Sequence, residues 1–132
     1  MAKVIRFEDL RKIRFNQLGE RQIMTGHNAM FVKNTVYPGF PPFPHKHPHE
    51  QILTIFSGVA DVTVGDETFR MGPGDMIYVP SNTMHDFRVV GDEPVINYDI
   101  FSPVREDFLM QLSQAEQEQK ENKDDNARRQ TK

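Results

Sequence analysis

The sequence predicts an all-β domain, a sandwich or a barrel, followed by one helix near the C-terminal end. Three features support this fold class: short runs rich in β-branched and aromatic residues, turn sequences with Gly or Pro between them, and one late segment with helical spacing. Many short strands joined by tight corners are typical of closed or two-sheet β architectures, because closure removes exposed strand edges.

Eight strands are expected, and each is bounded by residues suited to tight turns. The strands are expected at residues 22–25, 29–37, 51–56, 59–64, 68–71, 76–79, 85–90 and 95–101. The turn sequences are Pro38-Gly39, Ser57-Gly58, Gly65-Asp66, Gly72-Pro73-Gly74, Pro80-Ser81-Asn82 and Gly91-Asp92. The earlier segment 7–15 fits a helix and a strand equally well.

The expected helix follows the last strand. Ser102 is suited to the N-cap and Pro103 to the first helical position, and apolar residues then recur at helical spacing at Val104, Phe108 and Leu112. The helix therefore has one apolar face that can pack on the β domain.

The chain of 132 residues is expected to form one domain over residues 1–112, comprising the β domain and the helix. Residues 113–132 contain no apolar side chain larger than Ala115 and Ala127 and are rich in Gln, Glu, Lys, Asp and Arg. Such a segment buries too little apolar surface to offset the entropy of ordering. A frayed helix end followed by a disordered tail is expected there.

The composition argues against several classes of function. A net charge of −3 without long basic clusters gives no electrostatic support for nucleic-acid binding. The chain has no Cys, which excludes disulfides, thiolate ligands and a Cys nucleophile. No apolar run approaches membrane-spanning length, and the N-terminal residues lack a signal-peptide pattern. A soluble cytoplasmic protein without membrane or nucleic-acid partners is expected.

Four of the five histidines fall in two places: His45, His47 and His49 lie close together, and His85 follows a strand bounded by Gly and Pro. Alternate residues of an extended chain share a face, so His45 and His47 project together. Imidazoles with a nearby oxygen donor suit Ni, Zn, Fe, Mn or Co. A surface loop with scattered histidines is the alternative.

The spacing around these histidines resembles that of the cupin family. The first cupin motif is a Gly, five residues, His-x-His, three or four residues, Glu, six residues and Gly; the second is a Gly, five residues, Pro-x-Gly, two residues, His, three residues and Asn. The matching positions are Gly39, His45, His47, Gln51 and Gly58 for the first motif, and Gly74, Pro80, Asn82, His85 and Val89 for the second. The resemblance implies a double-stranded β-helix (jelly-roll) barrel. It also implies one divalent first-row metal held by His45, His47, Gln51 and His85.

Gln51 stands where cupins usually carry Glu. Its amide oxygen can still bind a metal, but it leaves the ion's double positive charge uncompensated, which favours Lewis-acid chemistry over oxygen activation. His49 is interpreted as a residue beside the site or on the surface, with the role of a fifth ligand as the alternative. Glu50 is expected to face away.

A second group of candidate residues lies where the last strand meets the helix. Asn97, Asp99 and Phe101 share one strand face, and an Asp facing a small barrel needs a partner or a chemical purpose. Arg105 could be that partner, which would make the two residues a structural pair. Alternatively, Asp99 is an acid/base and Arg105 clamps a substrate carboxylate with its bidentate fork.

Residues 21–112 resemble a subgroup of small single-domain cupins, the KdgF-like proteins of pectin degradation. These proteins convert 4,5-unsaturated uronates, released from pectin or alginate, into open-chain 5-keto-4-deoxyuronate. The resemblance implies a set of three His and one Gln for the metal, and catalytic roles for Asp99, Phe101 and Arg105. It implies a non-redox isomerase or lyase-type enzyme with a small uronate or sugar-acid substrate, and a homodimer. A metal-dependent cupin dioxygenase and a non-catalytic sugar-binding or ligand-binding cupin are the alternatives.

Overall fold

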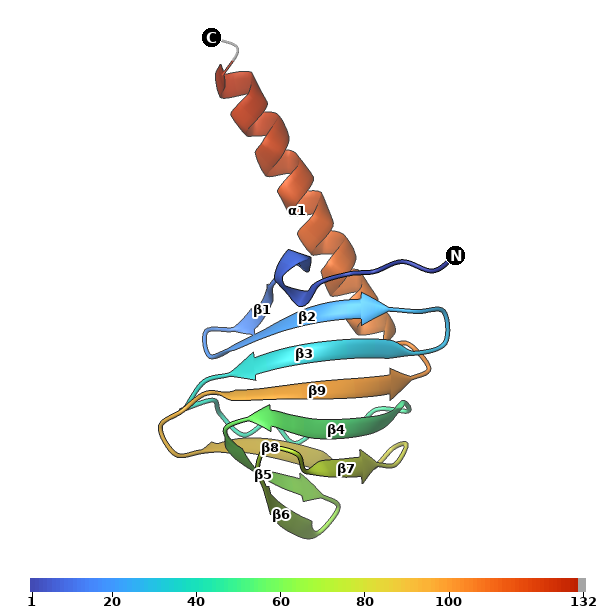
Figure 1. Ribbon diagram of the computed structural model, residues 1–132, viewed down its shortest axis with the longest axis vertical. Coiled ribbons are helices and arrows are strands. Elements are labelled where there is room, and N and C mark those ends of the chain that lie inside the picture. The colour runs from blue at the N-terminus through green and yellow to red at the C-terminus, as the bar shows by residue number, and fades with distance from the viewer. Residues whose placement is uncertain (131–132) are drawn as a thin grey trace.

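Two antiparallel sheets pack against each other, and one helix follows them, as Figure 1 shows for the computed structural model. The structure describes residues 1–130, with side chains through residue 121. The elements are η1 (Phe7–Asp9), β1 (Ile13–Asn16), β2 (Gly19–Thr25), β3 (Met30–Val36), β4 (Glu50–Ser57), β5 (Val59–Val64), β6 (Glu67–Met71), β7 (Met76–Val79), β8 (His85–Val90), β9 (Val95–Ser102) and α1 (Glu106–Gln130).

The last strand, β9, lies in the middle of the larger sheet. This sheet has the order β1-β2-β3-β9-β4-β7, and the smaller sheet has the order β6-β5-β8. Asp99 of β9 is paired in register with Val32 of β3 on one side and with Leu53 of β4 on the other. This arrangement confirms the predicted all-β jelly-roll with one C-terminal helix, and it places Asp99 at the centre of the sheet.

The core lies between the sheets and beneath the helix. Alternate residues of β3, β4 and β9 face inward, and Val32, Ile55 and Phe101 are almost completely buried. One cluster of apolar side chains joins β4 and β9 to the smaller sheet through Ala60 and Val62. The pocket described below lies where polar residues replace apolar ones on the same inward faces.

The segment that the sequence left open contains both kinds of structure. Residues Phe7–Asp9 form the short helix η1, and Ile13–Asn16 form β1, which pairs with β2. The Phe7 ring lies 5.8 Å from that of Phe31 and 5.6 Å from that of Tyr98, so the N-terminal segment covers aromatic side chains of β3 and β9.

The helix begins later and extends further than predicted. Ser102 does not cap it: the residue belongs to β9, and its Oγ donates a hydrogen bond to the Asn28 carbonyl over 3.1 Å. Phe108 is buried as expected, and Ala115 packs against the same apolar cluster. The helix continues past Leu112 to Gln130. Beyond Ala115, the Gln117 side chain donates a hydrogen bond to Glu121 on the next turn.

The predicted tail therefore starts inside α1, which projects away from the sheets in Figure 1. The last two residues of the predicted tail, 131–132, lie outside the described part of the chain. Among the described residues, no helix combines the length and the hydropathy needed to cross a bilayer.

The outer face of the larger sheet exposes several large apolar side chains. They come from β4, β7 and β9, and they are Ile52, Phe56, Met76, Tyr78 and Ile100. An exposed apolar patch of this kind often marks a contact surface. The homodimer expected from the sequence stays a prediction, and this face offers apolar area for it.

A single residue, Gly58, connects β4 to β5, and we expect it to tolerate no side chain. Its φ is +85°, and a Cβ there would lie 2.5 Å from the Pro94 carbonyl oxygen and 3.0 Å from the Val95 Cα. Gly65 also has a positive φ, +64°, but a Cβ would meet nothing within 4 Å. Gly65→Ala therefore measures the backbone strain alone, about 1 kcal/mol.

Gly58→Ala should lower the free energy of unfolding by at least about 2 kcal/mol more than Gly65→Ala, because the extra atom collides with backbone that cannot rotate away. Urea unfolding of the metal-free proteins measures both values. Equal losses for the two variants would show that the β4–β5 connection has room to adjust.

Candidate functional site

The structure brings three of the predicted ligand histidines together from distant parts of the chain. His45 and His47 lie in the segment before β4, and His85 is the first residue of β8. Two backbone hydrogen bonds between His45 and His85, of 3.0 and 2.9 Å, join the segments. The candidate ligand atoms of the three residues all lie within 4.8 Å of one another.

Backbone carbonyls orient all three imidazoles in the same way. The Nδ1 atom of each ring lies close to a carbonyl oxygen two residues away in the chain, at 2.8 Å for His45 and His85 and 3.0 Å for His47. A carbonyl oxygen only accepts hydrogen bonds, so Nδ1 carries the proton and Nε2 keeps a lone pair. The Nε2 atom of His85 is buried and has no hydrogen-bond partner among the described residues. Such carbonyl contacts are typical of histidines that bind a metal.

Gln51 adds an oxygen donor on the same side. Its Nε2 donates a hydrogen bond to the Asp99 carboxylate over 2.9 Å, and its Oε1 lies 3.2 Å from His47 Nε2. Because a carboxylate accepts hydrogen bonds, Asp99 determines which end of the amide faces the histidines. The Gln51 Oε1 and His47 Nε2 atoms, which both carry lone pairs, then face each other at 3.2 Å. Neither can donate a hydrogen bond to the other, whereas a cation bound by both would stabilise the arrangement. His45, His47, Gln51 and His85 therefore fit a divalent metal ion.

The surroundings of His47 and His85 keep these two imidazoles neutral. Burial, then the positive charge of Arg105 and the proximity of a second ionisable imidazole, His85, lower the pKa of His47 to about 4. Burial is also the main cause of the lowered pKa of His85. Metal binding requires deprotonated imidazoles, so these two residues need release no proton at neutral pH.

Asp99 is buried and holds amide groups with both oxygens. Besides Gln51, it accepts a hydrogen bond from Asn34 Nδ2 over 2.7 Å. Burial raises the pKa of Asp99 to about 6, although the hydrogen bonds from Gln51, Asn97 and Asn34 act in the opposite direction. A carboxyl with this pKa can give or take a proton near neutral pH.

Arg105 does not pair with Asp99, so that structural interpretation of the sequence is wrong. Its Nε and Nη2 atoms instead donate to the two carboxylate oxygens of Asp107, over 3.1 and 2.7 Å. The acidic side chain two residues away in the chain is the nearer partner, while Asp99 is satisfied by amides. The Arg105 guanidinium carbon lies 5.0 Å from the centroid of the Phe101 ring and 3.9 Å from that of Phe108.

One pocket of about 400 Å³ connects these groups. Phe101 separates the histidines from the helix, with ring centroids 5.6 Å from both His47 and Phe108. The polar residues that line the pocket come from both sheets, the loops and the helix: Asn16, Arg21, Asn34, His45, Gln51, His85, Asp86, Asn97, Asp99, Arg105, Asp107 and Gln111. The structure thus brings together Asp99, Phe101 and Arg105, the three predicted catalytic residues, beside the candidate metal centre.

Several polar pocket residues, among them Arg21 and Asn34, were not found from the sequence. Arg21 and Asn34 are paired in register on β2 and β3. Neither belongs to a motif, and only the strand register shows that both line the pocket.

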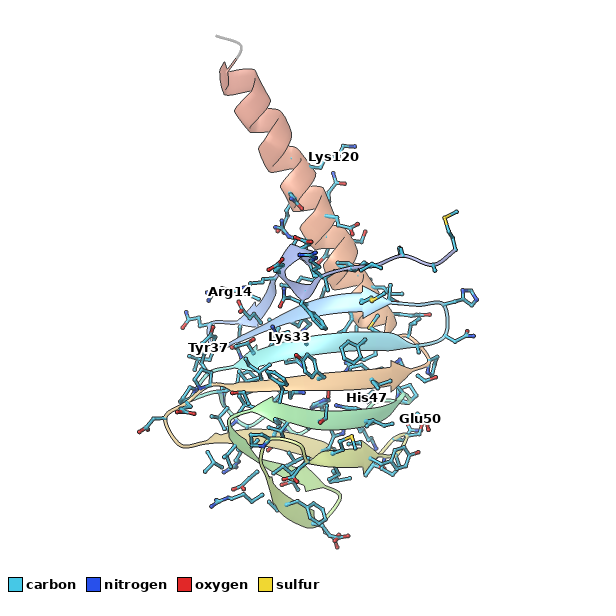
Figure 2. The ribbon with its side chains drawn as sticks, in the orientation of Figure 1. Arg14, Lys33, Tyr37, His47, Glu50 and Lys120 are labelled. Carbon is cyan, nitrogen blue, oxygen red and sulfur yellow. The ribbon has the colours of Figure 1, made fainter. Side chains whose placement is uncertain are left out.

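His49 and Glu50 match their predicted secondary roles. The His49 backbone carbonyl accepts the hydrogen bond from His47, while its side chain is not part of the three-histidine cluster. Glu50 is exposed and accepts a hydrogen bond from the Tyr78 hydroxyl over 3.1 Å. Figure 2 labels His47 and Glu50 at the same end of β4.

The family model described as "Cupin domain" matches residues 34–101, a range that contains all four candidate ligands together with Asp99 and Phe101. The chain belongs to the cupin family.

Solved structures agree with this assignment. An RmlC-like cupin from Shewanella frigidimarina NCIMB 400 is 27% identical, with 82% of this cupin and 96% of that chain covered and a TM-score of 0.75. KdgF from Halomonas sp. is 25% identical, with 82% and 99% covered and a TM-score of 0.75.

An uncharacterised protein of Streptomyces coelicolor is 32% identical over 57 residues, which cover 43% of this chain. The chain spans about half the length of that curated relative, 53%. The resemblance to a small KdgF-like cupin is thereby confirmed at the level of family and fold, and the cupin neighbours and the histidine cluster support a metal-dependent enzyme.

The first prediction for this site is metal uptake. The wild type should take up about one divalent ion per chain, and a free-ion concentration of about one hundred times Kd should stabilise it by about 2.7 kcal/mol. His47→Ala should lose both effects, whereas His27→Ala, in an exposed turn, should keep both. Elemental analysis and melting curves on the same samples give the answer. Failure of the wild type to take up any added metal would contradict the assignment.

A second prediction concerns the hydrogen bond between Gln51 and Asp99. Gln51→Glu places two carboxylates side by side. Asp99→Asn puts an amide between two amide donors, Gln51 and Asn34, so that one of them must face the N–H group of the new side chain. Each variant should therefore lose about 1–3 kcal/mol of stability. The double variant restores an amide opposite a carboxylate, with Asn34 still donating to position 99. The losses should therefore be strongly non-additive, with a coupling of about 0.5–3 kcal/mol. Unfolding of metal-free protein measures this cycle, and additive losses would show that the two side chains act independently.

Proposed function

We propose that this cupin is a metal-dependent enzyme that converts 4,5-unsaturated uronates into open-chain 5-keto-4-deoxyuronate. The observation that carries the proposal is the convergence of a three-histidine cluster, of which His45 and His85 line the pocket, with a buried carboxyl and cationic side chains. The likeness to KdgF supports the same reaction class. The ligand set also supports it, because Gln51 is a neutral donor and adds no negative charge to the metal.

The reaction requires a proton to move between two substrate atoms. The C1 hydroxyl loses its proton as the bond between C1 and the ring oxygen breaks, which leaves an aldehyde at C1. The former ring oxygen then becomes the 5-keto oxygen, and C4 gains a proton as the C4–C5 double bond is lost. The overall change is an isomerisation that needs no oxidant or reductant.

Asp99 is the proposed proton carrier. Three amide donors, Gln51, Asn34 and Asn97, occupy three of the about four lone-pair sites of the carboxylate, which leaves a place for a proton. Its pKa of about 6 lets it exchange protons near neutral pH. A metal bound by His45, His47, Gln51 and His85 would supply Lewis acidity to substrate oxygens.

Phe101 and Arg105 have supporting roles in this proposal. Phe101 forms an apolar wall between the histidines and the helix, with its ring between those of His47 and Phe108. Arg105 contributes positive charge, but Asp107 already occupies its Nε–Nη2 edge. Bidentate capture of a substrate carboxylate by that edge would require the pair to open.

Incubation of the metal-loaded protein with 4,5-unsaturated galacturonate tests the proposal. The absorbance of the substrate alkene should fall faster than in the metal-free control, and an oxygen electrode should register no consumption. Oxygen uptake during turnover would instead indicate a cupin dioxygenase. Recovery of unchanged substrate after binding would indicate a non-catalytic ligand-binding cupin.

The same assay separates a chemical role of Asp99 from a purely structural one. Asp99→Asn should lower kcat per bound metal by about 10²- to 10⁴-fold, whereas Asp66→Asn, in an exposed turn, should not. The double variant with Gln51→Glu restores the hydrogen-bond pair but moves the carboxylate, so it should fold and remain slow. Recovery of wild-type kcat in the double variant would show that the carboxylate at position 99 only orients its neighbour.

A further inference from the structure

Among the described residues that line the pocket, Arg21 is the arginine without a carboxylate partner. It lies on β2, and its guanidinium carbon is 4.2 Å from the centroid of the Phe15 ring and 4.0 Å from that of Phe108. Its Nε and Nη1 atoms are buried, and no described residue accepts a hydrogen bond from either of them. A buried cation without an acceptor is costly, and contacts with aromatic rings compensate only part of that cost.

The other charged groups of the pocket already have partners. Arg105 is bound by Asp107, and both oxygens of Asp99 are bound by amides. The two guanidinium groups also lie near the same ring: the carbons of Arg21 and Arg105 are 4.0 and 3.9 Å from the Phe108 centroid. This end of the pocket therefore has two guanidinium groups, and the Asp107 carboxylate binds only that of Arg105.

The charge of Arg21 persists at neutral pH. Burial, and then the neighbouring charge of Arg105, lower its pKa to about 10, while Asp99 and Asp107 act in the opposite direction. At pH 7 the side chain is still almost fully protonated. An anionic ligand group placed beside it would supply the acceptors that the folded chain does not.

We propose that Arg21, not Arg105, binds the carboxylate of the substrate and makes the pocket selective for organic acids over their neutral analogues. The identity of that acid as a uronate rests on the proposed function, whereas the preference for a carboxylate rests on the geometry of Arg21 alone. The carboxylate then lies at the Phe15–Phe108 end of the pocket. The rest of the ligand extends toward His45, Gln51, His85 and Asp99, which line the same pocket.

Binding of two stable probes tests the proposal without any turnover. Saturated D-galacturonate and its neutral methyl ester are titrated calorimetrically into the metal-loaded wild type, which should bind the acid at least about tenfold more tightly, as expected for charge-assisted hydrogen bonds. Arg21→Gln should abolish this preference. Arg14→Gln, the same change at an exposed position of β1 labelled in Figure 2, should keep it.

Arg21→Lys keeps the positive charge but removes the planar guanidinium, so it separates the contribution of charge from that of bidentate geometry. The same variant provides the test if Arg21→Gln does not fold. It should keep only part of the preference, because a lysine presents a point charge rather than a planar fork. The proposal is overturned if the wild type shows no preference, or if Arg21→Gln retains the preference while Arg105→Gln loses it.

Turnover of unsaturated galacturonate gives a separate readout. Arg21→Gln should raise KM about tenfold or more with a smaller change in kcat, because Asp99 and the histidines remain in place. If the wild type does not convert the unsaturated uronate but still prefers the acid probe through Arg21, the proposed reaction fails and the carboxylate site stands. If turnover occurs and the Arg21 variants keep the wild-type preference and KM, the reaction stands and the assignment of Arg21 fails.

Discussion

The hydrogen bond from Gln51 to Asp99 determines the chemical character of the whole site. An amide side chain has one donating and one accepting end, and only an acceptor on the sheet side directs its oxygen toward the histidines. Asp99 is that acceptor, and β9 holds it there by its pairing with β3 and β4. The neutral ligand and the buried carboxyl therefore depend on each other, and both depend on the position of the central strand.

The same network explains how the barrel accommodates an acid in its interior. Burial disfavours the charged form of Asp99, and amide donors on both oxygens recover part of that loss. The resulting pKa shift of Asp99 is opposite in direction to that of His47. As the pH falls from 6.5 toward 4, the unfolded chain binds a proton at His47 that the folded protein does not, so the free energy of unfolding decreases. As the pH falls from about 6 toward 3.8, the folded protein binds a proton at Asp99 that the unfolded chain does not, so the free energy of unfolding increases. The two effects largely cancel where these ranges overlap.

The sequence predicted the metal centre better than it predicted the rest of the pocket. His45, His47 and Gln51 lie within seven consecutive positions, and His85 follows a turn with its own signature, so short-range spacing was sufficient. Arg21 and Asn34 depend on strand register, which composition and periodicity do not specify. The partner of Arg105 was missed for a related reason, since the choice between Asp99 and Asp107 depends on side-chain packing at the start of the helix. The sequence indicated a polar helix end after Leu112 but not the residue at which the helix stops, because a polar sequence without capping signals does not define that position.

The position of β9 has a consequence for how the chain folds. It is the last strand in the sequence, yet it lies between β3 and β4, and the pairing of Met30 with Phe101 joins residues about seventy positions apart. Such distant contacts form slowly, because a long loop must close before they contribute. Until β9 inserts, β3 and β4 have unpaired edges facing each other, the type of surface that promotes aggregation. During synthesis, the pocket can therefore close only after nearly the whole barrel has left the ribosome, and Asp99 can direct Gln51 only from that moment.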